Sequence, residues 1–270
     1  MKLWVLGSGS RGNAVLLESG GTRILIDAGF PCNVIAERLQ GIDVEPESIE
    51  AVVVTHEHHD HVRGVGSGSR KWGWQIYATA GTRVAAKSLR AATVNTVGRS
   101  ACFNIGDFDL TTAPVAHDAV EPVAIVAVSR STGASAGVVY DLGCVNHGLR
   151  ECIRGVDMLV MESNHDEIML QRGPYPMSLR ARIGGRNGHL SNKDSAETVA
   201  SVARGGLRHV ILAHLSEWCN EPTLALGTMR DRLGRTSFRG KITAAPQDSA
   251  IGPFMAAMVS RSSSQLTLNL

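Results

Sequence analysis

The sequence predicts an α/β fold that carries a metal site at the ends of its strands. Short apolar, β-branched segments alternate with segments of helical periodicity along the chain. Four of the ten histidines fall within residues 56–61, directly after the apolar segment 52–54. Other aspartate and histidine residues follow further apolar segments, and α/β sheets gather ligand-binding residues at the carboxyl ends of their strands.

The N-terminal part of the chain favours three strands and a helix. The strands are predicted over residues 2–6, 14–18 and 22–27. The Gly/Ser-rich turn Gly7–Asn13 is not a phosphate-binding loop, because it joins strand to strand and no GK[ST] follows. A short helix is predicted over 31–40, with proline in its first turn and Val34, Ile35 and Leu39 on one face.

The C-terminal part favours a helix, a strand and a second helix. A capping box at Ser191–Asp194 opens the first helix. A strand over 208–213 then leads to His214, and the second helix is predicted over 222–233. The Ser-rich end predicts a loose tail at about residues 260–270, which an edge strand could close.

The histidine block gives the strongest signal for function. His56 and His58 leave the preceding strand as residues i and i+2 and are expected on one face, while Asp60 and His61 can turn toward a second ion. Imidazole combined with carboxylate suits Zn, Mn or Fe. A solvated, His-rich loop is the alternative, but it does not explain why the pattern follows a strand. We therefore expect two ions side by side.

Four more residues of ligand type follow or lie beside apolar segments: Asp27, His117, Asp141 and His214. Taken singly, each has an ordinary explanation, such as a cap or a turn for an aspartate and a buried core imidazole for a histidine. Their shared position at strand ends, together with the histidine block, indicates a single constellation.

The composition is that of an enzyme-sized globular protein. The 270 residues are 43% hydrophobic and 19% charged. No apolar stretch approaches the roughly 18 residues needed to span a bilayer, and the first residues lead into a strand rather than a signal sequence, so we expect a cytoplasmic protein without a membrane partner. The five cysteines lack CxxC spacing and are expected to be reduced thiols rather than ligands.

The charge is unevenly distributed, although the net charge is only +2. Residues 62–106 contain seven bases and no acid, and residues 168–193 contain five bases and no acid. Trp72, Trp74 and Tyr77 lie within the first stretch, and bases combined with aromatic side chains are typical of nucleic-acid-binding surfaces. The alternative is that the tryptophans belong to the core and the bases to solvated helix faces.

In their order along the chain, the candidate ligands resemble those of the metallo-β-lactamase superfamily, and the resemblance extends over nearly the whole sequence. It implies a single domain over residues 1–270 with a four-layer αββα sandwich. It also implies two ions whose ligand sets are joined by a bridging aspartate. The resemblance assigns one ion to His56, His58 and His117, the other to Asp60, His61 and His214, the bridge to Asp141, and the orientation of the histidine block to Asp27.

Within the superfamily, several motifs look like those of the YycJ/WalJ group of bacterial nucleases: SGSRGN, THEHHDHVRGVG, AHDAVEP, ESNHD, GHLSN and AHLSEWCNEP. This resemblance implies a 5′-to-3′ exonuclease that acts on DNA with two divalent ions, zinc or manganese. Val123 stands where the group is expected to have glycine, which affects no ligand.

Cleavage of a phosphodiester also needs an acid. Two cations roughly 3.5–4 Å apart supply a hydroxide nucleophile and polarise the phosphoryl oxygen, but the leaving sugar oxygen still needs a proton. His189 occupies the place of a catalytic GH[ST] histidine in related tRNA-processing enzymes and is the predicted general acid. Glu162 is its predicted orienting carboxylate, and Asp60 is counted with them as catalytic as well as a ligand. A helix-capping loop is the alternative explanation for the segment around His189.

The second basic stretch supplies the predicted contacts to nucleic acid, with DNA favoured: Arg180, Arg182 and Arg186. A small-molecule ester or cyclic phosphodiester hydrolase would share every ligand, because fold does not fix substrate, but would not explain the basic stretches. A diiron redox protein is disfavoured, because its pattern resembles HxExD and His58 takes the middle place here. A non-catalytic nucleic-acid-binding module would be expected to have lost ligands.

Overall fold

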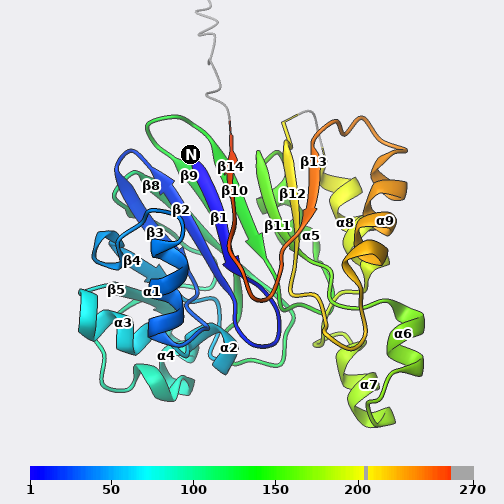
Figure 1. The fold of residues 1–270 in the computed structure, drawn as a ribbon, viewed down its shortest axis with the longest axis horizontal. Coiled ribbons are helices and arrows are strands. Elements are labelled where there is room, and N and C mark those ends of the chain that lie inside the picture. The colour runs from blue at the N-terminus through cyan, green and yellow to red at the C-terminus, as the bar shows by residue number, and fades with distance from the viewer. Residues whose placement is uncertain (204–205, 257–270) are drawn as a thin grey trace, which may run out of the picture.

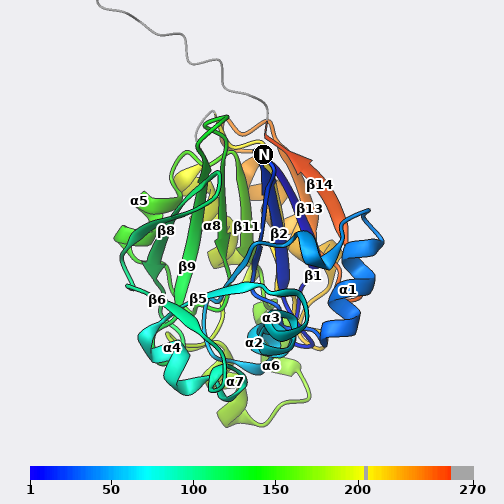
Figure 2. The ribbon, with the colours of Figure 1, turned by 90° about the vertical axis from the view of Figure 1, so that its left-hand side faces the viewer.

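Two β-sheets face one another, and helices cover the outer side of each (Figures 1 and 2). The structure, a computed structural model, describes residues 1–203 and 206–256. The predicted four-layer αββα sandwich is confirmed.

The first sheet is mixed and holds the N-terminal part of the chain. Its strands are β1 (Lys2–Gly7), β2 (Ala14–Ser19), β3 (Thr22–Ile26), β4 (Ala51–Val53), β5 (Gln75–Thr79), β6 (Val94–Val97) and β14 (Ile251–Met255). They lie in the order β14-β1-β2-β3-β4-β5-β6, antiparallel from β14 to β3 and parallel from β3 to β6. The carboxyl ends of β1, β3 and β4 therefore share one edge.

The second sheet is also mixed. Its strands are β7 (Cys102–Ile105), β8 (Phe108–Pro114), β9 (Val123–Ser129), β10 (Ser135–Val139), β11 (Met158–Glu162), β12 (His209–Ala213) and β13 (Lys241–Ala244). They lie in the order β13-β12-β11-β10-β9-β8-β7, antiparallel from β7 to β10 and parallel from β10 to β13. The carboxyl ends of β8, β10, β11 and β12 therefore share one edge.

The helices form the two outer layers and one projecting group. They are α1 (Cys32–Gln40), α2 (His59–Val62), α3 (Val65–Trp72), α4 (Ala80–Ala85), α5 (His147–Ile153), α6 (Glu167–Arg172), α7 (Met177–Ile183), α8 (Asn192–Val202) and α9 (Pro222–Leu233), with 3-10 turns η1 (Pro46–Ser48) and η2 (Lys87–Leu89). In Figure 1, α1 and α3 flank the first sheet, α8 and α9 flank the second, and α6 and α7 project below it. None of the helices within residues 1–203 and 206–256 has the length and apolar character that a bilayer crossing requires.

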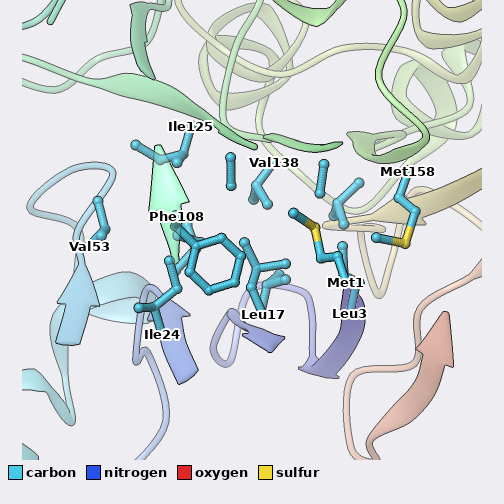
Figure 3. Packing of buried hydrophobic residues seen from close by; sticks show 14 of the residues in the cluster. Met1, Leu3, Leu17, Ile24, Val53, Phe108, Ile125, Val138 and Met158 are labelled. Carbon is cyan, nitrogen blue, oxygen red and sulfur yellow. The ribbon is translucent and has the colours of Figure 1, made fainter. Parts of the chain in front are cut away.

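Three clusters of buried side chains hold the layers together. Between the sheets, Leu17, Phe108 and Val138 belong to one cluster (Figure 3). Leu39 of α1 packs in a second cluster on the outer face of the first sheet, and Val199 of α8 packs in a third on the outer face of the second. Burial of each side chain of this size contributes about 1.5–3 kcal/mol to the stability of the fold. The packed core therefore fixes the positions of the strand ends.

The helices predicted from the sequence are confirmed. The helix predicted over 31–40 is α1, and it buries Ile35 and Leu39. The Ser191 side chain caps α8 by accepting the backbone N–H of Asp194, and α9 begins at its proline. The predicted tail at 260–270, with its edge strand, lies outside the described residues.

The aromatic residues of the basic stretch 62–106 do not form the stacking surface that their spacing predicted. Trp74 is 1% exposed, and its indole N–H donates to the carbonyl of Pro46 at 2.7 Å. Tyr77 is half-buried and stacks on Phe103, with ring centroids 5.5 Å apart. The prediction was wrong for these two residues, because burying a large ring stabilises the fold more than exposing it.

Candidate metal centre

The strand ends of the two sheets bring the predicted ligands to one place. In the first sheet, Asp27 follows β3 and His56 lies in the loop after β4. In the second sheet, His117 follows β8, Asp141 follows β10 and His214 follows β12. His56, His117, Asp141 and His214 each belong to at least one group of possible ligands whose ligand atoms lie within 4.8 Å of one another. Asp27 belongs to none of these groups and contacts the centre through His61.

The backbone turns sharply at three of these strand ends. Asp27, Asp141 and His214 have φ angles of 60°, 56° and 54°. Left-handed conformations are uncommon for residues other than glycine, and they cluster at functional sites, where the surroundings hold them in place. The fold therefore stabilises an unfavourable backbone conformation at three predicted site residues.

The histidine block converges, but not through the strand alternation that its spacing predicted. β4 already ends at Val53, and Asp60 and His61 lie on the short helix α2 rather than in a turn. The loop between β4 and α2 still brings the rings of His56 and His58 together, with centroids 4.6 Å apart. One helical turn then presents Asp60 and His61 to the same space.

The described residues contain four overlapping groups of possible ligands, and the ligand atoms of each group lie within 4.8 Å of one another. Two of the groups have the members that the resemblance implied: His56, His58 and His117, and Asp60, His61 and His214. The other two are His56, His61 and Asp141, and Asp141, Glu162, His189 and His214. Asp141 lies between the two groups that the resemblance implied, with Oδ2 2.8 Å from His61 Nε2 and Oδ1 3.8 Å from His117 Nε2. A carboxylate in this position can bridge two ions.

Hydrogen bonds at Nδ1 orient four of the imidazoles. The contacts are His56 to Thr55 Oγ1 at 3.0 Å, His61 to Asp27 Oδ2 at 2.7 Å, His117 to the carbonyl of Gly188 at 3.1 Å, and His214 to Glu162 Oε1 at 2.9 Å. Carbonyl and carboxylate oxygens only accept, and the single Thr55 hydroxyl proton is already donated to Asp27, so each Nδ1 is the donor. Nε2 is therefore the nitrogen that faces the centre in each ring, which is how metal-binding histidines are usually arranged.

Two buried nitrogen atoms of the centre have no hydrogen-bond partner among the described residues: His56 Nε2 and His214 Nε2. Leaving a polar group buried and unpaired costs about 1–3 kcal/mol, so these atoms require an explanation. Coordination of a cation provides one, because each atom is a metal-ligand type on a residue of the two groups. The residues present therefore fit divalent metal ions.

The two carboxylates and His56 have protonation states that suit metal binding. Burial alone would raise the pKa of Asp141, but His214 and His61 hold it well below its usual range. Burial would also raise the pKa of Asp60, but His61 and His214 lower it below its usual value. Burial lowers the pKa of His56 well below its usual value, so this imidazole is neutral. In return, and despite burial, Asp141 raises the pKa of His61 and raises that of His214 to about 10, so these two imidazoles would each release a proton when a metal ion binds.

Asp27, predicted to orient the histidine block, is the centre of a buried hydrogen-bond network. Its Oδ2 accepts from His61 Nδ1, from the Thr55 hydroxyl and from the Tyr140 hydroxyl, each at 2.7 Å, and its Oδ1 accepts from the Thr55 backbone N–H at 2.8 Å. Burial and Asp27 raise the pKa of Tyr140 well above its usual value, so the phenol keeps its proton and donates. The sequence analysis missed Thr55 and Tyr140, whose only signal was their position beside His56 and Asp141.

His189 and Glu162 meet, as their predicted roles require. His189 Nδ1 lies 2.9 Å from Glu162 Oε1, which also contacts His214. The other oxygen of Glu162 accepts the backbone N–H groups of Leu142 and Leu190, each at 3.1 Å. Burial would raise the pKa of Glu162, but His189 and His214 lower it to about 2. In return, Glu162 raises the pKa of His189 despite its burial.

A pocket of about 260 Å³ opens over this centre. Candidate ligands and the predicted acid line it, among them Asp60, Asp141, His189 and His214. Leu179, Arg182 and Ile183 of α7 form part of its wall, so α7 lies at the pocket rim.

The three arginines predicted to contact DNA have different surroundings. Arg182 lines the pocket, and its Nε donates to Asp118 Oδ2 at 2.7 Å. Arg186 is exposed. Arg180 is half-buried and donates to the carbonyl of Gln171, which links α7 to α6. The sequence analysis had no reason to distinguish the three.

Comparisons with known proteins agree with this geometry. Residues 7–124 match the sequence profile of the metallo-beta-lactamase superfamily. The exodeoxyribonuclease WalJ of Streptococcus pneumoniae is 33% identical over 242 residues, which cover 87% of this chain and 88% of that protein. The exodeoxyribonuclease YycJ of Bacillus anthracis is 32% identical over 218 residues, which cover 78% of this chain and 81% of that protein.

A solved structure shows the same fold at lower identity. The crystal structure of YhfI, a metallo-beta-lactamase fold protein from Bacillus subtilis, matches with a TM-score of 0.70 at 18% identity and covers 93% of this chain and 98% of that one. Since the relatives above exceed 30% identity over most of both chains, the family is established. The chain belongs to the metallo-β-lactamase superfamily of metal-dependent hydrolases and, within it, to the family of WalJ and YycJ.

Proposed function

We propose that this chain is an exodeoxyribonuclease that cleaves DNA in the 5′-to-3′ direction with two divalent metal ions, zinc or manganese. The observation that carries the proposal is the position of Asp141 between the two groups of candidate ligands, 2.8 Å from His61 and 3.8 Å from His117. A paired site of this form suits the in-line hydrolysis of a phosphodiester. The names of the two curated relatives, both exodeoxyribonucleases, support DNA as the substrate.

The chain would hold both ions through side chains that are already oriented. When bound, the ions would lower the pKa of a water molecule to provide the nucleophile and would polarise a phosphoryl oxygen. His56, His58 and His117 would bind one ion, and Asp60, His61 and His214 the other. Asp27 would fix the ring of His61 by accepting its Nδ1–H at 2.7 Å.

His189 would protonate the leaving sugar oxygen. Its side chain is 21% exposed and lines the pocket, so it can contact a substrate. Glu162 accepts from Nδ1 and raises the pKa of His189, which favours the doubly protonated imidazole that a general acid requires. A positioned acid with a pKa near or above the working pH is suited to this step.

The bases of the α7 segment would contact the phosphate backbone of the substrate: Arg180, Arg182 and Arg186. Arg182 is the best placed, because it lines the pocket and 65% of its side chain is exposed. A small phosphodiester is the second candidate substrate, because a pocket of about 260 Å³ could enclose one.

End-labelled oligonucleotides test the proposal. Single-stranded and double-stranded DNA and RNA, labelled at either end, would be digested with Zn, Mn and Mg in turn, with bis-p-nitrophenyl phosphate assayed in parallel. The expected result is stepwise shortening of DNA from the 5′ end with Zn or Mn, and none with Asp141→Ala. Hydrolysis of the small diester without any cleavage of DNA would contradict the proposal and favour the second candidate.

A further inference from the structure

A second cavity, of about 190 Å³, lies beside the candidate metal centre. The Gly7–Asn13 turn separates the two cavities. Ser10 lines the pocket of the metal centre, whereas Ser8 and Arg11, close to it in the same turn, line the second cavity. Since consecutive Cα atoms lie about 3.8 Å apart, only the thickness of one turn divides them.

The strand end at β12 leads to the same conclusion. His214 lines the metal-centre pocket, and the next residues, Leu215, Ser216 and Glu217, line the second cavity. The Gly7–Asn13 turn and this strand end therefore both place the second cavity next to the pocket of the metal centre.

The turn between the two cavities is a fixed wall. The backbone N–H of Arg11 donates to Gln247 Oε1 at 3.1 Å, and Gln247 Nε2 donates to the carbonyl of Gly12 at 3.3 Å, so a side chain that lines the second cavity also holds the turn. The Ser8 hydroxyl donates to Asn13 Oδ1 at 2.8 Å and accepts the backbone N–H of His214 at 2.8 Å. The turn is thus tied directly to a candidate ligand.

The opposite wall, residues 215–222, is held from beneath by buried amides. Asn220 donates to the carbonyls of Ser163 and Asn164 at 2.8 and 3.0 Å, and its Oδ1 accepts from Asn192 Nδ2 at 2.8 Å. A cavity whose walls are fixed before binding loses little conformational entropy when a ligand enters.

The lining suits a flat aromatic ring with a polar edge. The apolar surface is formed by Leu215, Pro222, Ala245 and Pro246. Two charged residues also line the cavity, Arg11 and the exposed Glu217. The volume of about 190 Å³ exceeds the roughly 150 Å³ of a protein cavity that binds benzene.

We propose that this cavity is a nucleobase subsite, which takes the base of a nucleotide adjacent to the scissile phosphate. The inference rests on the proposed function, and it specifies the conformation in which the DNA strand would bind. The apolar walls would contact the faces of the base, and Glu217 would accept from an exocyclic amine. Arg11 is paired with Asp248, with Nη2 2.8 Å from Oδ2, so it lines the cavity as one half of an ion pair. A base can enter such a cavity only when it is unpaired and unstacked, so the subsite selects a single-stranded or frayed end.

Oligonucleotides with one abasic position test the subsite without altering the protein. The abasic residue would be moved one position at a time from the cleaved end, and kcat/KM measured for each. With the parental protein, the loss should be about tenfold at a single position next to the scissile phosphate and small elsewhere, since a base contact is worth about 1–3 kcal/mol.

Two variants assign that loss to the cavity. In Leu215→Ala and in Glu217→Ala, the abasic penalty at that position should shrink, because the intact base has lost its contact. Leu226→Ala and Glu47→Ala are matched controls: Leu226 packs against the same apolar cluster as Leu215, and Glu47 is an exposed carboxylate before β4. Both controls should keep the full penalty.

The outcomes that would overturn the inference are distinct from those that would overturn the proposed function. If DNA is cut but the abasic penalty is equal at all positions, or is unchanged in both cavity variants, the nucleobase subsite is wrong and the exonuclease proposal stands. If no DNA is cut with any metal, both proposals fail.

Discussion

The candidate metal centre and α7 lie side by side but are built differently. Asp27, His61 and Glu162 are 0% exposed, and their oxygen and nitrogen atoms are held by hydrogen bonds from several strand ends. In contrast, α7 has no buried residue, and Met177 is 78% exposed; the helix projects below the second sheet in Figure 1. Substitutions in the centre should therefore alter chemistry and metal binding, whereas those at exposed positions of α7 should alter substrate contacts alone.

The largest effect is expected at the bridge between the two groups. Asp141→Ala should lose at least one bound ion, and its activity should fall to that of metal-free protein, because the carboxylate lies within reach of ligands of both groups. His58→Ala should also lose an ion together with activity. Elemental analysis and a DNA digestion assay measure the two effects. Retention of both ions and of activity in Asp141→Ala would mean that this carboxylate is not a ligand.

The next largest effect separates the acid from the ligands. His189→Ala should keep both ions and bind DNA normally, but cleave it roughly 10²–10⁴ times more slowly, the usual contribution of a positioned acid. Hydrolysis of bis-p-nitrophenyl phosphate should remain near the parental rate, because its leaving group needs little protonation. Loss of metal, or an equal loss on both substrates, would make His189 a ligand or a structural residue instead.

A smaller effect is expected one step away from the ligands. Tyr140→Phe removes the hydroxyl that donates to Asp27 at 2.7 Å and should weaken metal affinity about 10–100-fold, as loss of such an orienting contact typically does. Competition with a chelator measures this affinity. Tyr77→Phe, which removes a phenol contact to Gln75, is the control and should bind metal normally. Equal metal affinity in the two variants would remove Tyr140 from the network that orients the ligands.

The smallest effects should come from the arginines of α7 and from Arg186, which follows it, and should depend on salt. Arg182→Ala and Arg186→Ala should each flatten the log–log salt dependence of DNA binding by about 0.7–0.9 per lost phosphate contact and spare turnover of a small diester. Arg180→Ala should flatten it less and instead lower the Tm, because Arg180 is half-buried and donates to Gln171 of α6. Equal losses on DNA and on the small diester for Arg182 and Arg186 would show that these residues support the fold.

The contrast between these regions also explains how much the sequence could predict. The ligands at strand ends were found because an apolar strand followed by histidine or aspartate is a local pattern, and His56, His58 and His117 do meet. The reason given for His56 and His58 was incomplete, because a loop and α2 bring the block together rather than strand alternation.

Contacts between distant segments were harder to predict. The double contact of Glu162 with His189 and His214 depends on the packing of β11 against β12, which no local pattern encodes. The aromatic residues of the first basic stretch were misread for a related reason: composition alone does not show that Trp74 is 1% exposed. Sequence patterns were sufficient to identify the candidate metal ligands. The residues exposed to a substrate could be identified only from the three-dimensional structure.

The metal content of the purified chain tests the central claim most directly. Elemental analysis of active protein should give about two divalent ions per chain, because Asp141 lies between two groups of candidate ligands and each group contains a buried Nε2 without a partner among the described residues. One tightly bound ion per chain, together with full activity on DNA, would contradict the paired metal centre.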